Sequence, residues 1–367
     1  MLLEVNRQWR SIARTTPALW RKLIVSGGPI PTSLRRGSRH ALASAEQAIC
    51  MLDRSAEADL DITFVLGPKE KHLHGRASIF QTVARKALPR TRVFRVIVNE
   101  REITVDFVEG FLKGMFTGGL PRLESLEINV SEARHLGWYH SFQEMMQVID
   151  TTSLNLKSIR LEHLKPSAIR LVAVHDYWKL LRRITIREWF TMLEITNFSG
   201  LDDLEFLSFS GYLEFPSSGS YPIKFPQLKE LYLSEISMSN LACLSLPELH
   251  TMVTREVTQD SPAPLPGSVC LPALKELLIG SFAGSTLTLA CITAPALQKL
   301  DLTMLGSLEE ATKIFNWVFN SGNDSMMRPQ CLIFRGPHMK DICLGAAHDG
   351  LRPELRFLEQ EEISLDP

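Results

Sequence analysis

The stretch Pro226-Gln-Leu228-Lys-Glu-Leu231-Tyr-Leu233 guides the interpretation of the whole chain, because its pattern of proline and leucine returns several times. Three further copies are Pro121-Arg-Leu123-Glu-Ser-Leu126-Glu-Ile128, Pro272-Ala-Leu274-Lys-Glu-Leu277-Leu-Ile279 and Pro295-Ala-Leu297-Gln-Lys-Leu300-Asp-Leu302. The shared pattern is P-x-L-x-x-L-x-L. Its last two apolar residues alternate, which is typical of a strand with one buried face. A phrase that returns in this way predicts a stack of similar structural units.

Weaker copies extend the pattern along most of the chain. The residues that take the place of Leu231 in successive copies are Leu60, Val96, Leu126, Ile159, Ile184, Leu207, Leu231, Met252, Leu277 and Leu300. Neighbouring copies are 21 to 36 residues apart, and the later spacings fall in the range of leucine-rich repeats. The longer early spacings leave room for helices over 107–116 and 142–149. Two terminal strands are expected around Ile333 and Leu358, after a helix over 308–319.

Stacked copies of this phrase predict an α/β fold. One strand and its return segment cannot bury an apolar face alone, so neighbouring copies share a continuous core. We therefore expect an irregular leucine-rich-repeat solenoid, with a parallel sheet on its concave face and helices or turns on its convex face. The solenoid is expected to span residues 59–367. Its strand surface is a binding surface rather than a site of chemistry.

Composition excludes several classes of function. Of the 367 residues, 45% are hydrophobic and 22% are charged, as in a folded protein that is not disordered. A net charge of −1 gives no electrostatic case for binding nucleic acid or an anionic membrane. The uncharged stretch around 278–297 is too polar to span a membrane, and the first residues form no signal-peptide core.

The sequence contains no recognisable catalytic or cofactor motif. G-x-S-x-G, the P-loop, G-x-G-x-x-G and H-E-x-x-H are all absent, so we expect no enzyme, no cofactor and no metal site. His72 and His74 are expected in an exposed loop. None of the six cysteines forms a C-x-x-C pair, which favours buried free thiols in a reducing compartment. The expected location is intracellular, in the cytoplasm, the nucleus or both.

The N-terminal segment carries a second pattern. Val5, Trp9, Ile12 and Ala13 fall at helical spacing and form one apolar stripe. Thr15, Thr16 and Pro17 end that helix, and Leu19 and Trp20 then fold back. From the residues alone, this is an amphipathic helix whose tryptophans anchor it to the next domain.

The same segment resembles the second half of an F-box, which closes with V-x-x-x-W-R-x-I-A-x-x-x-P-x-L-W. The matching residues are Val5, Trp9, Arg10, Ile12, Ala13, Pro17, Leu19 and Trp20. The resemblance implies binding to a Skp-type adaptor of a cullin–RING ligase through Val5, Trp9, Ile12, Ala13, Pro17, Leu19 and Trp20. The first half of an F-box, an L-P-x-E-I-L helix, does not precede the match, so we expect an F-box truncated at its N-terminus.

A further resemblance follows the N-terminal segment. Met51-Leu-Asp-Arg54-Ser55 ends an expected helix over 40–55 and leads into the strand Leu60-Asp-Ile62-Thr-Phe64. This order is similar to a segment of F-box proteins that are abundant in mushroom-forming fungi. The expected domains are a partial F-box over 1–25, a linker and helix over 26–58, and the repeats from 59 onward.

Together the resemblances imply the substrate-recognition subunit of a Skp–cullin–F-box ubiquitin ligase that binds an unidentified protein target through its repeats. The alternative is a leucine-rich-repeat interaction module without a ligase role, in which Trp9 and Trp20 cap the first repeat.

Overall fold

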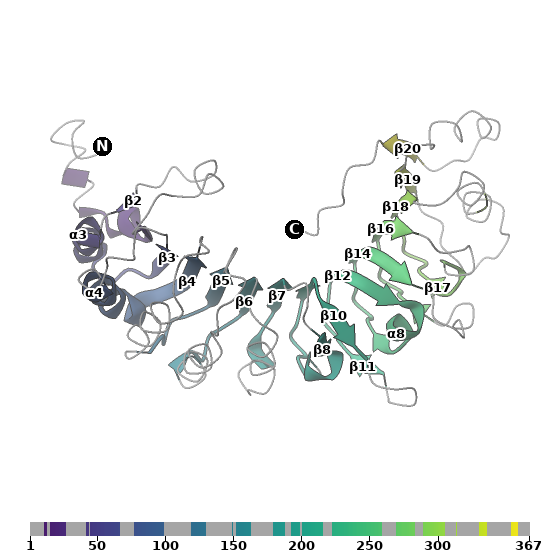
Figure 1. The fold of residues 1–367 in the computed structure, drawn as a ribbon, viewed down its shortest axis with the longest axis horizontal. Coiled ribbons are helices and arrows are strands. Elements are labelled where there is room, and N and C mark those ends of the chain that lie inside the picture. The colour runs from purple at the N-terminus through teal and green to yellow at the C-terminus, as the bar shows by residue number, and fades with distance from the viewer. Residues whose placement is uncertain are drawn as a thin grey trace. The chain divides into compact units, whose positions relative to one another are not determined.

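The chain folds as two compact units, Met1–Leu181 (unit 1) and Arg182–Pro367 (unit 2), and both are built on parallel strands (Figure 1). The computed structural model describes residues 11–12, 15–26, 42–43, 45–66, 77–98, 119–129, 149, 152–162, 179–187, 192–198, 200–215, 222–258, 269–282, 289–304, 313, 330–335 and 354–358. Helices are few in these ranges, so the fold class is α/β with a predominance of strand.

Unit 1 contains a parallel sheet with the strand order β2-β1-β3-β4-β5-β6. The strands are β1 (Lys22–Ser26), β2 (Leu42–Ala43), β3 (Leu60–Leu66), β4 (Thr91–Val98), β5 (Ser125–Asn129) and β6 (Ser158–Glu162). The helices are α3 (Ala45–Ser55) and α4 (Ala77–Ala87), with the 3₁₀ turns η2 (Pro17–Trp20) and η4 (Leu88–Arg90).

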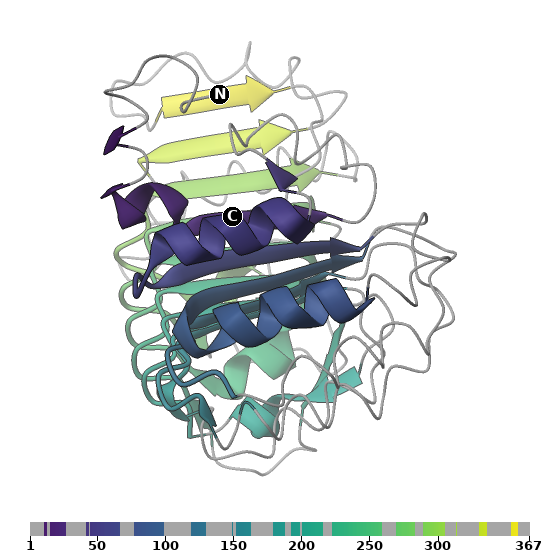
Figure 2. The same ribbon diagram turned by 90° about the vertical axis from the view of Figure 1, so that its left-hand side faces the viewer.

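The helices α3 and α4 lie on the same face of the unit 1 sheet (Figure 2). Ala48 and Leu52 of α3 and Val83 of α4 are buried there. Phe64 and Phe94, on adjacent strands, point into the core with ring centroids 5.9 Å apart. Because side chains alternate along a strand, the intervening residues of β4, β5 and β6 lie on the opposite face of the sheet.

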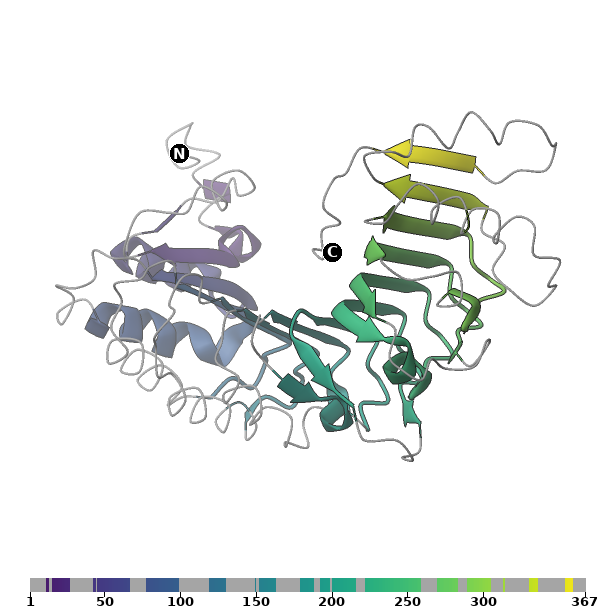
Figure 3. The same cartoon turned by 45° about the vertical axis from the view of Figure 1, so that its right-hand side comes forward.

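Unit 2 contains a second run of parallel strands in the order β7-β9-β12-β14-β16-β18-β19-β20 (Figure 3). These strands are β7 (Arg183–Arg187), β9 (Phe206–Phe209), β12 (Glu230–Ser237), β14 (Thr251–Thr258), β16 (Glu276–Phe282), β18 (Lys299–Met304), β19 (Cys331–Arg335) and β20 (Glu354–Leu358).

On one side of the main strands of unit 2, below them in Figure 1, lie short paired strands and the short helix α8 (Figures 1 and 3). The pairs are β8 (Met192–Glu194) with β10 (Tyr212–Glu214), β11 (Ile223–Lys224) with β13 (Leu244–Ser245), and β15 (Val269–Cys270) with β17 (Ile292–Thr293). The remaining elements are η7 (Ile195–Phe198) and α8 (Met238–Ala242). The side chain of Ser237 caps α8 by accepting a hydrogen bond from the backbone N–H of Asn240 at 3.2 Å.

The proline and first leucine of the repeated phrase form the same turn before each strand. In the copy at Pro272, the N–H of Leu274 donates to the carbonyl of Leu271 at 3.2 Å, and both leucines are buried. Equivalent bonds link Leu123 to Leu120, Leu228 to Phe225, Leu249 to Leu246 and Leu297 to Ala294. Proline suits the second position of such a turn, because its ring presets φ near −65°.

Strand register confirms most of the positions expected from the phrase. Leu126 pairs with Ile159, and in unit 2 the expected residues align from strand to strand: Ile184, Leu207, Leu231, Met252, Leu277 and Leu300. The early expectations were wrong by two residues, since Ile62 and Phe94, not Leu60 and Val96, align with Leu126. An alternating strand offers equivalent apolar positions two residues apart, so its pattern alone leaves this choice open.

The two terminal strands exist, but their aligned residues differ from the expected ones. Leu300 pairs with Leu332 rather than Ile333, and Leu332 pairs with Leu355 rather than Leu358. Ile333 therefore lies on the other face of its strand, because a shift of one residue reverses the side-chain direction.

The predicted helices agree with the structure only in part. The helix expected over 40–55 begins at Ala45, after β2, and the strand β1 and the helix α4 were not expected. The helices expected over 107–116, 142–149 and 308–319 lie outside the described residues, apart from Ile149 and Lys313.

The described cysteines are free thiols, but Cys50 and Cys270 are exposed and only Cys291 is buried. Burial raises the pKa of the Cys291 thiol.

Candidate functional site

The N-terminal segment presents two large apolar side chains to solvent. Ile12 is 40% exposed and Leu19 is 51% exposed, and both occupy positions expected to contact an adaptor. Pro17 and Trp20 are half-buried within η2. Of the other residues expected at this site, Val5, Trp9 and Ala13 lie outside the described residues.

Trp20 attaches this segment to the rest of unit 1. The turn η2 packs against α3, and the guanidinium carbon of Arg54 lies 5.0 Å from the centroid of the Trp20 ring. At this distance the cation is attracted by the π face of the ring. The structure therefore separates the predicted residues into an anchored one, Trp20, and exposed ones, Ile12 and Leu19.

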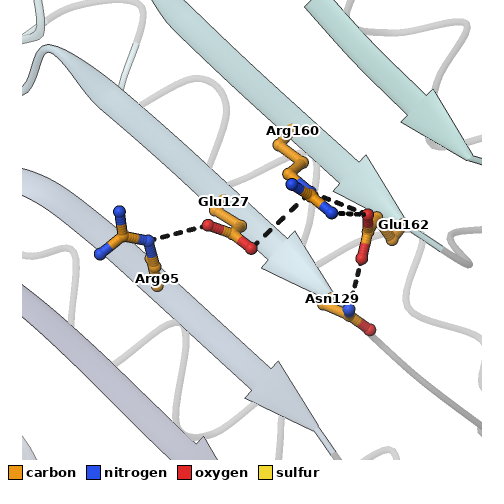
Figure 4. Close-up of polar contacts among 5 residues, drawn as sticks. All are labelled: Arg95, Glu127, Asn129, Arg160 and Glu162. Atoms are coloured by element: carbon orange, nitrogen blue, oxygen red, sulfur yellow. Dashed lines mark hydrogen bonds and ion pairs between the residues drawn. The ribbon is translucent and has the colours of Figure 1, made fainter. Parts of the chain in front are cut away.

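A second candidate surface is the face of the unit 1 sheet opposite the helices. We call it the charged face and define it by Asp61, Arg95, Glu127, Asn129, Arg160 and Glu162. The strand register aligns Arg95 with Glu127 and Glu127 with Arg160, so opposite charges alternate across β4, β5 and β6 (Figure 4). Nε of Arg95 donates to Oε2 of Glu127 at 2.8 Å, and Nε of Arg160 lies 3.8 Å from Oε1 of Glu127.

Glu162 is the most deeply buried member of the charged face. Its side chain is 4% exposed, and Oε1 accepts from Nε of Arg160 at 2.8 Å and from Nη2 at 2.6 Å. Nδ2 of Asn129 donates to its other oxygen. A buried carboxylate needs such partners, because removing it from water costs several kcal/mol. Glu162 thus neutralises Arg160, whereas Glu127, at 22% exposure, remains accessible.

The main strands of unit 2 carry an aromatic cluster. The rings of Phe206 and Tyr232 lie 5.3 Å apart, and the guanidinium of Arg183 lies 4.3 Å above the Phe206 ring. Tyr232 Oη donates to Oε2 of Glu230 at 3.3 Å. Partial burial raises the pKa of Tyr232, and the negative charge of Glu230 raises it further. Tyrosine and arginine are enriched in binding hot spots, so this cluster is a candidate contact surface.

A buried ion pair stabilises the end of unit 2. Asp301 on β18 is fully buried, and both of its oxygens accept from Arg335 on β19, with Nε and Nη2 each at 2.8 Å. Such a bidentate pair holds the two strands in register. Since both of these guanidinium nitrogens are engaged, this arginine serves the fold more than a ligand.

The charged face could have been found from the sequence. Arg95, Glu127 and Arg160 each occupy the middle position of an apolar-x-apolar triplet, in Phe94-Arg-Val96, Leu126-Glu-Ile128 and Ile159-Arg-Leu161. Charges of alternating sign at equivalent positions of neighbouring strands are the sequence signal for such a face.

No group of three or more potential metal ligands occurs among the described residues, and His72 and His74 lie outside them. No helix in the described part of the chain has the length and apolar composition needed to span a bilayer.

No family model matches this chain, and no curated protein matches it.

Proposed function

We propose that this chain is the target-recognition subunit of a Skp–cullin–F-box ubiquitin ligase. The N-terminal segment contacts the adaptor, and the strands, stacked as an irregular leucine-rich-repeat solenoid, present a surface to a protein target. The ligase chemistry belongs to other subunits of the complex.

The exposure of Ile12 and Leu19 is the observation that carries the adaptor half of the proposal. Exposing a large apolar side chain to water is unfavourable by about 25 cal/mol per Å² of apolar surface, and a partner that covers it recovers this energy. Both residues occupy positions that the F-box resemblance assigns to the adaptor. Single exposed apolar residues are common on proteins, so their position in this motif, rather than their exposure alone, supports the assignment.

The adaptor contact is tested with the full chain and a purified Skp-type adaptor in a titration calorimeter. We expect the wild-type chain to bind, and Leu19→Asp or Ile12→Asp to weaken binding by roughly tenfold or more. Leu154→Asp is the matched control, because Leu154 is also in unit 1 and is 71% exposed, but lies outside the motif. Absence of binding by the wild-type chain, or equal losses for Leu19→Asp and Leu154→Asp, would refute the adaptor contact.

The second candidate function is an interaction module without a ligase role. The contact between Trp20 and Arg54 favours it, because a tryptophan that caps unit 1 would have the same environment. Trp20→Ala separates the candidates when stability and adaptor affinity are both measured. If Trp20 only caps unit 1, Trp20→Ala lowers the free energy of unfolding and leaves the adaptor affinity unchanged. If Trp20 belongs to an F-box contact, Trp20→Ala lowers the adaptor affinity as well.

A further inference from the structure

We infer that Arg95 anchors a carboxylate side chain of an acidic peptide segment in the protein target. The inference rests on the target-binding half of the proposed function and names the chemical class of the partner. It does not depend on the adaptor contact.

The orientation of Arg95 is the first argument. Its Nε is held by Glu127 at 2.8 Å, and Figure 4 shows its two terminal nitrogens on the side away from Glu127. The side chain is 40% exposed. A guanidinium presents its donors in a planar fork that matches a carboxylate, and fixing Nε in advance reduces the entropy lost on binding.

The neighbouring arginine is committed elsewhere, which makes Arg95 the anchor. Arg160 uses both Nε and Nη2 to bind the buried Glu162. By contrast, the bond that Arg95 makes to Glu127 engages Nε, and among the residues that the structure describes nothing else pairs with its terminal nitrogens, so this fork is available to a second acceptor. A peptide side chain can therefore bind Arg95 without breaking the ion pairs among Arg95, Glu127, Arg160 and Glu162, which we call the ladder.

The charge balance of the ladder selects a carboxylate over a phosphate. The ladder contains two arginines and two glutamates and so has no net charge. The remaining carboxylate of the charged face, Asp61, is paired with Arg92 at 3.5 Å. A phosphate group of nearly two negative charges would experience repulsion from both glutamates, with a single open arginine to offset it. A carboxylate carries one charge and fits the fork of Arg95.

The test uses the labelled full chain and an array of short synthetic peptides. Each peptide is present with Asp and Glu, with Asn and Gln in their place, and with phosphoserine in their place. We expect the acidic peptides to be retained preferentially and Arg95→Gln to weaken their binding by about tenfold or more. Arg95→Lys is expected to restore binding partly, since lysine keeps the charge and loses the fork.

Arg122→Gln is the matched control. Arg122 is 50% exposed and pairs with Asp59 at 2.9 Å, but it lies outside the charged face. Equal binding by wild type and Arg95→Gln, equal retention of acidic and amide peptides, or preference for phosphoserine would each overturn the inference while leaving target binding intact. Retention of no peptide of any composition would overturn the inference together with the target-binding half of the proposed function.

Discussion

Replacing Asp301 by alanine is expected to destabilise the protein far more than replacing Glu127 by alanine, although each carboxylate pairs with an arginine on an adjacent strand. The difference comes from burial. Asp301 is fully buried and binds Arg335, whose side chain is 15% exposed, through two bonds of 2.8 Å. Glu127 binds Arg95 through one such bond, and the two side chains are 22% and 40% exposed.

The expected magnitudes follow from this contrast. Removing one partner of a buried pair leaves the other charge poorly compensated, and typically costs about 3 to 5 kcal/mol. An exposed pair is screened by solvent and contributes about 0 to 1 kcal/mol. We therefore expect Asp301→Ala to lower the free energy of unfolding by about 3 kcal/mol or more. Glu127→Ala should lower it by about 1 kcal/mol or less.

The assay is urea denaturation of the full chain, followed by far-UV circular dichroism and tryptophan fluorescence. Agreement of the two signals shows whether both units unfold in one transition, which a single free energy requires. The double variant Asp301→Leu/Arg335→Met is the control, because replacing both charges by apolar side chains of similar volume is often neutral. Equal losses for Asp301→Ala and Glu127→Ala, or no recovery in the double variant, would refute this reasoning.

Two further predictions concern other parts of the chain. The raised pKa of Tyr232 means that the folded state favours the neutral phenol over the phenolate. The resulting contribution of Tyr232 to the free energy of unfolding is fully present below pH of about 10, the usual tyrosine pKa, and is lost as the pH rises through the folded-state pKa. Tyr232→Phe should flatten the alkaline loss of stability seen in urea titrations, and an unchanged slope would contradict the assignment. Gly119 has φ of +70°, and an added Cβ would lie 2.9 Å from Cγ2 of Thr152. Gly119→Ala should therefore lower the free energy of unfolding by about 1 to 3 kcal/mol, and Gly200→Ala, also at positive φ but in open space, should cost less.

The strands of unit 2 were predicted well because the same short turn-and-strand motif repeats in them. Each clear copy pairs a proline turn with buried leucines at fixed offsets, so the turn sets where the strand begins. The early strands were placed less well for two reasons. No proline turn precedes β3, and in the turn before β4, Pro89-Arg-Thr91, threonine takes the place of the first leucine. Both strands also offer several alternating apolar positions. The helix α4 was not predicted, although Val83, Ala84 and Ala87 fall at helical spacing and pack in the core.

The candidate site was predicted less completely than the fold. Its charged residues stand singly between apolar residues of the strands and form no catalytic spacing. Arg95, Glu127 and Arg160 are 32 and 33 residues apart in sequence, and the sheet places them on adjacent strands in direct register. The exposure of Ile12 and Leu19 likewise depends on which neighbours cover them.

The sequence by itself determined the α/β class and the strand positions of unit 2, because turns and alternation are local properties of a few neighbouring residues. The tertiary structure decided which polar residues meet and how deeply they are buried. Asp301 and Glu127 look alike in sequence, each standing between apolar neighbours of a strand. The packing around them makes one a fully buried structural partner and leaves the other accessible, because burial is set by residues far away along the chain.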